Sequence, residues 1–484
     1  MNDMSGLKDQ DLLIGGRRVA PLTGQYFESI NPATEQAIAR IAKGGAEDVD
    51  RAVAAARAAF DGEWGHMKAS DRGRLLLRLA DLIEKNGEEL VMLESVDSGK
   101  PVSAVRRQDL PAVIDTLVYY AGMADKINGQ VIPARTDALT YTVREPLGVV
   151  GAIIPWNFPM MIGMWKFAPA LACGCTLVVK PAELTSLTAL RIAELALEAG
   201  VPAGAFNIVT GPGRVVGEAM VAHPDIDKIT FTGSPSVGRQ IMQGAAGNLK
   251  RVTLELGGKS ANVIFPDANL DAAVKAAGSG IFFNTGQVCS AGSRILAHAS
   301  IYDEVVERLA ARANTMRIGD PLEASTSMGP LVSATQMKRV LDYIDIGRKE
   351  GASIVTGGER SGDRGFYVQP TVFAGVEHQM RVSQEEIFGP VAAVVRFEDD
   401  DDAIRIANGT VYSLAAGVWT ADVTRAHRFT RALKAGTVWV NTYGPTDIRL
   451  PWGGARDSGL GREHGDMAID NFTEPKAVWI NTGR

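Results

Sequence analysis

Cysteine, histidine and surplus basic charge are all scarce in this chain of 484 residues. Its three cysteines cannot form the disulfide framework of a small secreted domain, so a reducing, cytoplasmic setting is expected. With 50 Lys and Arg against 56 Asp and Glu, the net charge is −6. This balance argues against a nucleic-acid partner, because such proteins usually carry a basic surface. The six histidines show no metal-binding spacing, so no metal site is expected.

Signals for secretion or membrane insertion are also missing. Residues 1–15 have neither a basic start nor a long apolar run, so no secretory leader is expected. Residues 146–165 carry no charge and could imitate a membrane span, but they include three prolines and Asn157. Prolines would break a spanning helix, and the amide would be buried in lipid. A buried parallel strand followed by a helix is the better interpretation, and no membrane partner is expected.

What the chain has is a regular alternation of strand and helix patterns. Apolar runs typical of strands occur at 148–155, 176–180, 206–209, 228–231 and 251–256, with helical patterns between them at 160–172, 186–199, 215–222 and 236–244. This rhythm predicts a doubly wound parallel sheet. A second alternation follows from 263 to about 440, with strands near 294–298, 392–397 and 437–441. Residues 130–144 are rich in Pro, Thr, Tyr and Val and predict a strand pair.

The common dinucleotide fingerprint G-x-G-x-x-G is absent. Gly211-Pro-Gly213 followed by Gly217 has one residue too many, and a simple turn is the favoured interpretation. Phe231-Thr-Gly-Ser234 is a stronger candidate, because it ends a strand and opens a helix whose N-terminus could face a pyrophosphate. A tight strand-to-helix turn without a ligand is the alternative.

Two residues stand out as candidates for chemistry. Cys289 lies in a small, polar, turn-forming segment, whereas Cys173 and Cys175 end an apolar helix and are expected to be buried. Glu255 ends an apolar strand beside two glycines, where burial would raise its pKa and make it a base near neutral pH. A cysteine paired with a distant histidine and an ordinary strand-end glutamate are the alternatives that the spacing leaves open.

Seven motifs in order make the chain resemble the NAD(P)-dependent aldehyde dehydrogenase superfamily. The resemblance extends from about residue 12 to residue 480. The motifs are Pro155-Trp-Asn-Phe-Pro159, Lys180-Pro-Ala-Glu183, Phe231-Thr-Gly-Ser234, Glu255-Leu-Gly-Gly-Lys259, Gly286-Gln-Val-Cys289, Glu386-Ile-Phe-Gly-Pro390 and Pro451-Trp-Gly-Gly454 with Ser458-Gly-Leu-Gly-Arg-Glu463.

The resemblance implies a three-part α/β fold. A discontinuous Rossmann-type NAD-binding domain is expected at 1–123 and 146–257, and an α/β catalytic domain at 258–457. A small β element at 124–145 and 458–484 would bridge subunits of a homo-oligomer, either a dimer or a tetramer.

The resemblance also implies a role for each matching residue. Cys289 would be the nucleophile, Glu255 the general base, and Asn157 an oxyanion-hole donor beside the backbone N–H of Cys289. The residues expected to bind the cofactor are Ile154, Trp156, Lys180, Glu183, Gly213, Phe231, Gly233, Ser234, Glu386 and Phe388. NAD is favoured over NADP, because Glu183 would repel a 2′-phosphate, although Lys180 could partly offset that repulsion.

The implied reaction is oxidation of an aldehyde to the acid through a thiohemiacetal and a thioester on Cys289. Coenzyme A-acylating relatives lack the glutamate found at 255, so hydrolysis is favoured. A non-catalytic structural protein on the same fold is the alternative from another class, and the loss of Cys289 or Asn157 would have supported it.

The aldehyde itself is left open. Phe158, Trp165, Phe283 and Trp452 match positions that line the substrate tunnel in relatives acting on amino and trimethylammonio aldehydes. Such an aromatic box could bind a quaternary ammonium group, as in a betaine or amino-aldehyde dehydrogenase, or form an apolar funnel for aromatic or medium-chain aldehydes. Asp447 would favour the cationic substrates and Arg449 the acidic semialdehydes.

Overall fold

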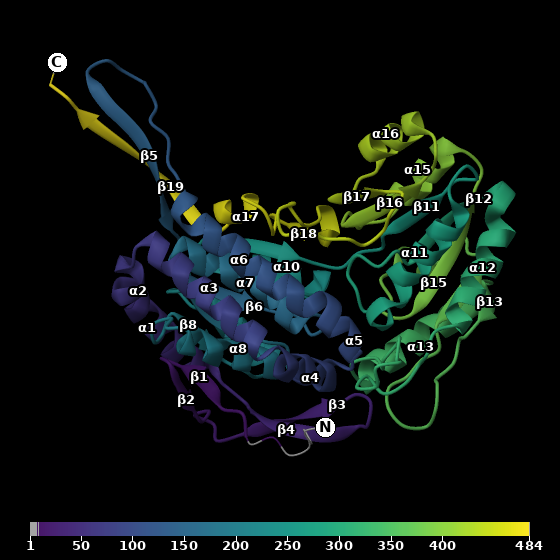
Figure 1. Ribbon diagram of the computed structural model, residues 1–484, viewed down its shortest axis with the longest axis horizontal. Coiled ribbons are helices and arrows are strands. Elements are labelled where there is room, and N and C mark those ends of the chain that lie inside the picture. Colours follow the sequence, from purple (N-terminus) through teal and green to yellow (C-terminus); the bar gives the residue numbers. More distant parts are fainter. Residues whose placement is uncertain (1–6, 8, 484) are drawn as a thin grey trace.

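Two large β-sheets organise the molecule, one towards each side in Figure 1. The structure is a computed structural model, and it describes residue 7 and residues 9–483. The first sheet has the strand order β18-β10-β9-β6-β7-β8-β1-β2, and the second has the order β13-β14-β15-β12-β11-β16-β17. Both sheets are parallel in their centres; the first has antiparallel strands at both edges, and the second has one antiparallel edge strand, β13.

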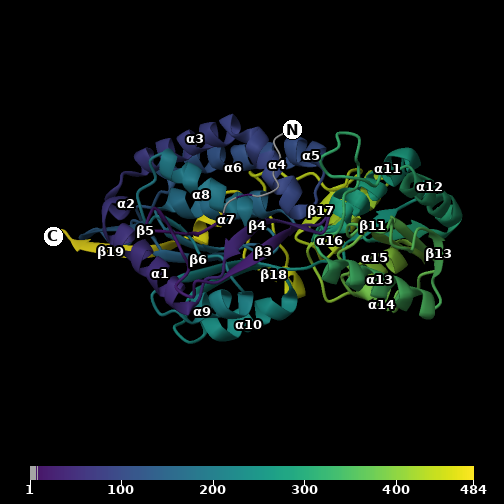
Figure 2. The ribbon, with the colours of Figure 1, turned by 90° about the horizontal axis from the view of Figure 1, so that it is seen from below.

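The first sheet contains the predicted alternation. Its parallel strands are β6 (Val149–Ile153), β7 (Thr176–Lys180), β8 (Phe206–Ile208), β9 (Lys228–Thr232) and β10 (Arg251–Glu255). The antiparallel edges are β1 (Leu12–Ile14), β2 (Arg17–Val19) and β18 (Gly459–Leu460). Figure 2 shows α8 (Leu187–Glu198) and α10 (Pro235–Ala245) on opposite sides of this sheet.

The uncharged stretch at 146–165 divides as the sequence predicts, into β6 and the first turns of α7 (Pro159–Cys173). Pro159 occupies the first helical position, where its missing N–H costs nothing. Every residue of α7 is buried, and the helix lies in the centre of the largest hydrophobic cluster. In the described part of the chain, no helix is long and apolar enough to cross a membrane.

The second sheet follows in sequence. Its strands are β11 (Ala261–Ile264), β12 (Arg294–His298), β13 (Ser353–Thr356), β14 (Thr371–Ala374), β15 (Val391–Phe397), β16 (Ala415–Trp419) and β17 (Thr437–Val440). Helices pack against them, chiefly α11 (Leu270–Phe282), α12 (Tyr302–Asn314), α13 (Ala334–Lys349), α15 (Asp400–Asn408) and α16 (Val423–Ala432).

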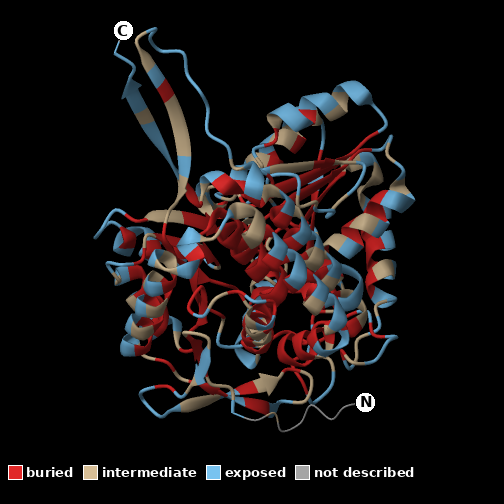
Figure 3. Cartoon of the chain, turned by 60° about the vertical axis from the view of Figure 1, so that its left-hand side comes forward, coloured by how far each residue is buried: buried red, intermediate tan, exposed pale blue. Residues whose placement is uncertain are grey.

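A long two-stranded arm corrects one prediction. The sequence predicts that two strands within 130–144 pair with each other, and this prediction is wrong. Instead, β5 (Ala138–Pro146) pairs along its length with β19 (Thr473–Asn481). The earlier residues contribute an isolated bridge, from Val131 to Tyr141. The two strands are far apart in the sequence, so no local pattern could join them. The arm projects from the body and is largely exposed, with Val131 and Trp479 at 74% and 61% (Figures 1 and 3).

Candidate active site

Cys289 lies on a strained loop that leaves α11. Asn284, Thr285 and Gly286 all have positive φ angles, of 47°, 56° and 73°. The two non-glycine residues each cost of order 1–3 kcal/mol in this conformation, and such strain concentrates at functional sites. A Cβ on Gly286 would come within 2.0 Å of the Gly389 carbonyl oxygen, so the loop packs tightly on the turn before β15. The result is a half-buried Cys289.

Asn157 reaches this loop from the turn between β6 and α7. Its Nδ2 donates to the Gln287 carbonyl at 2.9 Å, and Asn284 Nδ2 donates to the Asn157 carbonyl at 3.0 Å. An amide nitrogen carries two N–H groups, so one remains for another acceptor. These two hydrogen bonds fix the turn and the cysteine loop against each other. Gln287, which accepts from the Asn157 amide, is two residues before Cys289 in the sequence.

Glu255 ends β10 and is buried next to the same loop. Burial raises its pKa well above the ordinary value, and the neighbouring Glu463 carboxylate raises it further. A Cβ on Gly453 would lie 2.4 Å from Glu255 Oε1, so the turn around Gly453 forms one wall of the carboxylate's site. The direction of this shift is the one expected for a carboxylate buried at a strand end.

Two nearby carboxylates affect the pKa of the Cys289 thiol. Burial raises its pKa to about 12, and the charges of Glu255 and Glu386 contribute to the shift, whereas backbone N–H groups of the loop oppose it. The thiol is therefore protonated at neutral pH and needs a base to become a nucleophile. Cys173 and Cys175 are buried in the core, as predicted, and burial raises the pKa of both thiols.

The first sheet offers a cofactor site at the point where its strand order reverses. From β6, the chain proceeds outwards through β7 and β8 on one side and returns to β9 and β10 on the other. In such sheets, ligands bind at the carboxyl ends of the strands that flank this switch point. The predicted cofactor residues at or directly after the carboxyl ends of these strands are Ile154, Trp156, Lys180, Phe231, Gly233 and Ser234. The Ser234 hydroxyl caps α10, accepting from Val237 N at 3.5 Å.

Glu183 and Gly213 meet on the rim of this site. Gly213 N donates to Glu183 Oε2 at 3.4 Å, and Gly213 begins a π-helical turn, Gly213–Gly217. Gly211, with a positive φ of 144°, lies in the turn between β8 and this helical segment, and Pro212 directly precedes the segment. Lys180 is buried, which lowers its pKa to about 8, and its Nζ donates to the Pro181 carbonyl at 2.9 Å.

Glu386 and Phe388 connect the two sheets. Glu386 Oε1 accepts from Gly258 N at 2.9 Å, and burial raises the pKa of this carboxyl to about 7. Phe388 has a positive φ of 62°, and its ring stands edge-on to Trp156 with centroids 5.1 Å apart. Trp156 follows β6 and Phe388 precedes β15, so this contact joins the turn after β6 to the segment before β15.

The four aromatic residues of the predicted tunnel form two pairs. Phe158 and Phe283 stack with ring centroids 6.2 Å apart, and Trp165 and Trp452 lie 6.0 Å apart. Both tryptophans are only 6% exposed. His464, which the sequence analysis did not single out, stands edge-on to Trp165 at 4.2 Å. The tryptophans thus contact each other and the histidine.

The two charged residues of the tunnel loop neutralise one another. Arg449 Nε donates to Asp447 Oδ1 at 2.8 Å, and a second guanidinium nitrogen donates to Oδ2 at 2.5 Å. This two-point contact lowers the pKa of Asp447 well below its usual range. The loop therefore carries a compensated ion pair rather than a single unpaired charge.

Comparison with known proteins decides the family. A model of the aldehyde dehydrogenase family matches residues 19–478. The chain belongs to the aldehyde dehydrogenase family. An aldehyde dehydrogenase from Aspergillus niger is 49% identical over 473 residues, which are 98% of this chain and 95% of that protein.

Solved structures of the family support the same assignment. An NAD+ complex of aldehyde dehydrogenase from Bacillus cereus has a TM-score of 0.97 at 48% identity, covering 98% of this chain and 96% of that one. Betaine aldehyde dehydrogenase from Staphylococcus aureus, also solved with NAD+, has a TM-score of 0.96 at 40% identity, with 98% and 95% covered. The predicted family, its α/β fold class and the prediction of an aldehyde dehydrogenase enzyme are confirmed.

Sequence reasoning missed the charged neighbours of Glu255. Lys166 on α7 and Glu463 form an ion pair with side chains 0% and 7% exposed, and both charges act on Glu255. Within the part of the chain that the structure describes, Glu463 Oε2 has no hydrogen-bond partner. One signal was available: Lys166 is the sole charged residue in an otherwise apolar helix, and charged residues are rarely fully buried unless paired.

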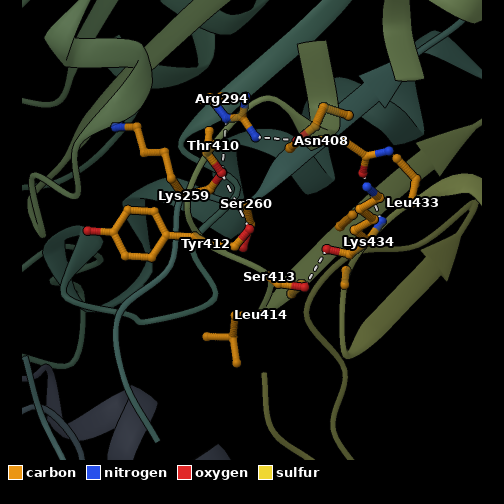
Figure 4. Close-up of a pocket in the computed structure, with 15 residues that line it drawn as sticks. Lys259, Ser260, Arg294, Asn408, Thr410, Tyr412, Ser413, Leu414, Leu433 and Lys434 are labelled. Carbon is orange, nitrogen blue, oxygen red and sulfur yellow. Dashed lines mark hydrogen bonds between the residues drawn. The ribbon is translucent and has the colours of Figure 1, made fainter. Parts of the chain in front are cut away.

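A small cavity behind the turn at Gly257 and Gly258 is a separate feature (Figure 4). Arg294 is buried there and donates to the carbonyls of Lys259, Ile406 and Ala407 at 2.9, 2.8 and 2.7 Å. It thereby ties the segment after Glu255 to the end of α15. None of the residues predicted to bind aldehyde or cofactor lines this cavity. Among the described residues, no group of three or more His, Cys, Asp or Glu could hold a metal ion.

Proposed function

We propose that the protein oxidises an aldehyde to the carboxylic acid with NAD+, through a thioester on Cys289. The observation that carries the proposal is the convergence of three groups from separate elements. Asn157 is anchored to the cysteine loop through Gln287, and the Glu255 carboxylate acts electrostatically on the Cys289 thiol. A nucleophile, an oxyanion donor and a base in one place are what acyl transfer requires.

In the first half-reaction, the Cys289 thiol releases its proton to solvent water, and the thiolate sulfur forms a bond to the aldehyde carbon. The carbonyl oxygen becomes an alkoxide, which accepts hydrogen bonds from the free N–H of Asn157 and the backbone N–H of Cys289. Preorganised donors of this kind contribute about 3–4 kcal/mol each. Bound NAD+ would supply the acceptor for the hydride, which departs from the carbon together with the electron pair of the C–H bond. A thioester on Cys289 remains.

In the second half-reaction, Glu255 takes a proton from a water molecule. The water oxygen attacks the thioester carbon, the acid is released, and the proton returns Cys289 to its thiol form. Burial suits Glu255 to this role, because its raised pKa makes it a stronger base than an exposed carboxylate. Lys166, paired with Glu463, limits how far that pKa rises.

The residues at the switch point of the first sheet fit a dinucleotide. Ser234 and the N-terminus of α10 would face the pyrophosphate, and Lys180 with Glu183 would hold the adenosine ribose. Glu386 would hold the nicotinamide ribose. The Bacillus cereus and Staphylococcus aureus relatives were solved with NAD+, which supports this cofactor.

A direct assay tests the function. The parent protein with NAD+ and a panel of aliphatic, aromatic, amino and acidic aldehydes should produce NADH and the free acid. Product formation only when coenzyme A is added would favour the acylating alternative. No NADH with any aldehyde and either cofactor would favour the non-catalytic alternative.

The cofactor preference depends on Glu183. We expect NAD+ to give a kcat/KM at least about tenfold above that for NADP+, because a 2′-phosphate beside a carboxylate meets a like charge. The Glu183→Gln variant should narrow this ratio by improving NADP+, while activity with NAD+ changes little. Equal kcat/KM values for the two cofactors in the parent would show that Glu183 does not meet the 2′ position.

We propose uncharged aldehydes as the substrates, because the tunnel loop offers a compensated Asp447–Arg449 pair and the two tryptophans pack on each other. The identity to the Aspergillus niger aldehyde dehydrogenase, 49% against 40% for the betaine aldehyde enzyme, supports this choice. The competing candidate is a betaine or amino aldehyde held in an aromatic box.

Betaine aldehyde and 3,3-dimethylbutanal separate these candidates, since they have the same shape and differ in charge. We expect the neutral compound to be preferred by the parent, and Trp452→Leu to reduce kcat/KM for both compounds by similar factors. A cationic box would instead give a preference for betaine aldehyde. Trp452→Leu would then weaken binding of betaine aldehyde alone, by about 0.5–2 kcal/mol, the contribution of one cation–π contact.

We also propose the domain division 1–123 with 146–257, 258–457, and 124–145 with 458–484, the last part forming subunit contacts. The exposed apolar side chains on the arm, among them Val131, Leu139, Trp479 and Ile480, support a homo-oligomer, because surfaces of this kind are usually covered.

A further inference from the structure

A buried group of charges lies beneath the start of α7, outside the site described above. Lys100 and Asp109 form an ion pair in which both side chains are 0% exposed, and Glu94 is buried beside them. Buried ion pairs contribute little net stability, because desolvation offsets their attraction. Their presence here therefore needs an explanation other than stability.

The group contacts the segment that carries the oxyanion amide. Lys100 Nζ lies 3.7 Å from the centroid of the Phe158 ring, which follows Asn157 directly. Glu94 Oε1 accepts from Met160 N at 3.4 Å, and its other oxygen accepts from the Thr188 hydroxyl at 2.8 Å. Two residues of the segment 157–160, Phe158 and Met160, thus contact this buried group of charges.

The other side of the same segment is held by the cysteine loop. Asn284 donates to the Asn157 carbonyl, and the Asn157 amide donates to Gln287. Phe158 also stacks on Phe283 of that loop. The segment is clamped between the buried charges and the nucleophile's loop, so a change on one side would move the amide relative to Cys289.

Two features of Asp109 indicate that the position of this ion pair matters more than its contribution to stability. It ends a π-helical turn, Val105–Asp109, a form that is rare and often found at functional sites. Its Oδ1 has no hydrogen-bond partner among the described residues, although the side chain is fully buried. An incompletely satisfied buried carboxylate is costly, and such costs are tolerated where a position matters more than stability.

We propose that Lys100, held by Asp109, is a positioning residue that sets the oxyanion amide of Asn157 through the Phe158 ring. The proposal rests on the proposed function, in which Asn157 stabilises the alkoxide. Lys100 touches no substrate. It acts by fixing the first residues of α7, since a displacement of about 1 Å in a reacting group can cost up to about a hundredfold in rate.

A double-mutant cycle tests this. The variant Lys100→Met with Asp109→Asn removes both charges and keeps the volumes, which such pairs often tolerate. We expect the rate of the NADH burst to fall about tenfold, with the Kd for NAD+ unchanged. Asn157→Ala alone should lose about 100- to 1,000-fold. In the Asn157→Ala background, the pair substitution should change the rate less than about twofold, because the group through which it acts is gone.

The Arg425→Met variant is the matched control. Arg425 also lies over a buried ring, 4.3 Å from Phe265, and is ion-paired, but it belongs to α16. It should leave the burst rate unchanged. An equal loss from the Lys100→Met/Asp109→Asn pair in both backgrounds would overturn the proposal, and a fully active Asn157→Ala would instead overturn the proposed function. If the pair variant does not fold, Glu94→Gln gives the same cycle, with a smaller loss that must also vanish without Asn157.

Discussion

Cys289→Ala is expected to abolish aldehyde oxidation while the Kd for NAD+ changes less than about twofold. The thiol forms the only bond between protein and substrate in the proposed reaction, and removing a nucleophile typically costs a millionfold in kcat. The side chain takes no part in the predicted cofactor contacts at β6, β7 and β9. Steady-state NADH formation and calorimetric titration with NAD+ measure the two quantities separately.

Cys175→Ala provides the control for this experiment. Cys175 is fully buried in the core, and its thiol contacts the Phe472 carbonyl, so its loss should lower stability slightly and leave kcat intact. More than a few per cent of the parent kcat in Cys289→Ala would rule out Cys289 as the nucleophile. A large loss of NAD+ affinity in the same variant would show that the loop, rather than the thiol, had been disturbed.

The sequence was sufficient for the fold where local patterns determine it. The run Thr176–Lys180 is a strand with the predicted limits, because four consecutive buried apolar or β-branched positions, followed by Lys180 and Pro181, suit a parallel strand. The arm was not predictable in the same way. The pairing of β5 with β19 joins residues more than 300 positions apart, and each strand is half exposed, so neither has a pattern that specifies a partner.

For the site, the sequence could identify groups but not their relations. A polar turn marked Cys289 and a strand end marked Glu255, and the family motifs added Asn157. Two of these relations depend on tertiary packing. Asn157 donates one N–H to Gln287, and Lys166 pairs with Glu463 near Glu255. The charge pattern of the tunnel loop was equally ambiguous, because Asp447 and Arg449 are two residues apart and only their side-chain torsions bring them together.

Strain was also hidden from the sequence. Asn284 and Phe388 have positive φ angles, although neither is a glycine and only Asn tolerates this conformation readily. Both flank the space where the cysteine, the amide and the predicted nicotinamide site meet. A Cβ on Gly286 would collide with the Gly389 carbonyl oxygen, and a Cβ on Gly389 would collide with the Val340 side chain, so close packing requires a glycine in each motif.

Glu255→Gln is expected to separate the two half-reactions. Glutamine keeps the shape of the side chain but cannot take a proton from water, so the thioester should form and then persist. Rapid mixing with aldehyde and NAD+ should give a burst of about one NADH per active site, followed by turnover reduced about 100- to 10,000-fold. The thioester on Cys289 should be detectable as a mass increase of the intact protein after acid quenching.

The pH dependence gives this prediction a second, independent readout. In the parent, hydrolysis needs the deprotonated carboxylate of Glu255, whose pKa is raised by burial and by Glu463. The hydrolysis rate should therefore rise with pH through that raised pKa and level off above it. In Glu255→Gln the rise should disappear, leaving the slower increase due to hydroxide. If the variant shows neither a burst nor slowed turnover, and keeps the parent's pH profile, Glu255 is not the base, and the buried Glu463 becomes the carboxylate to substitute next.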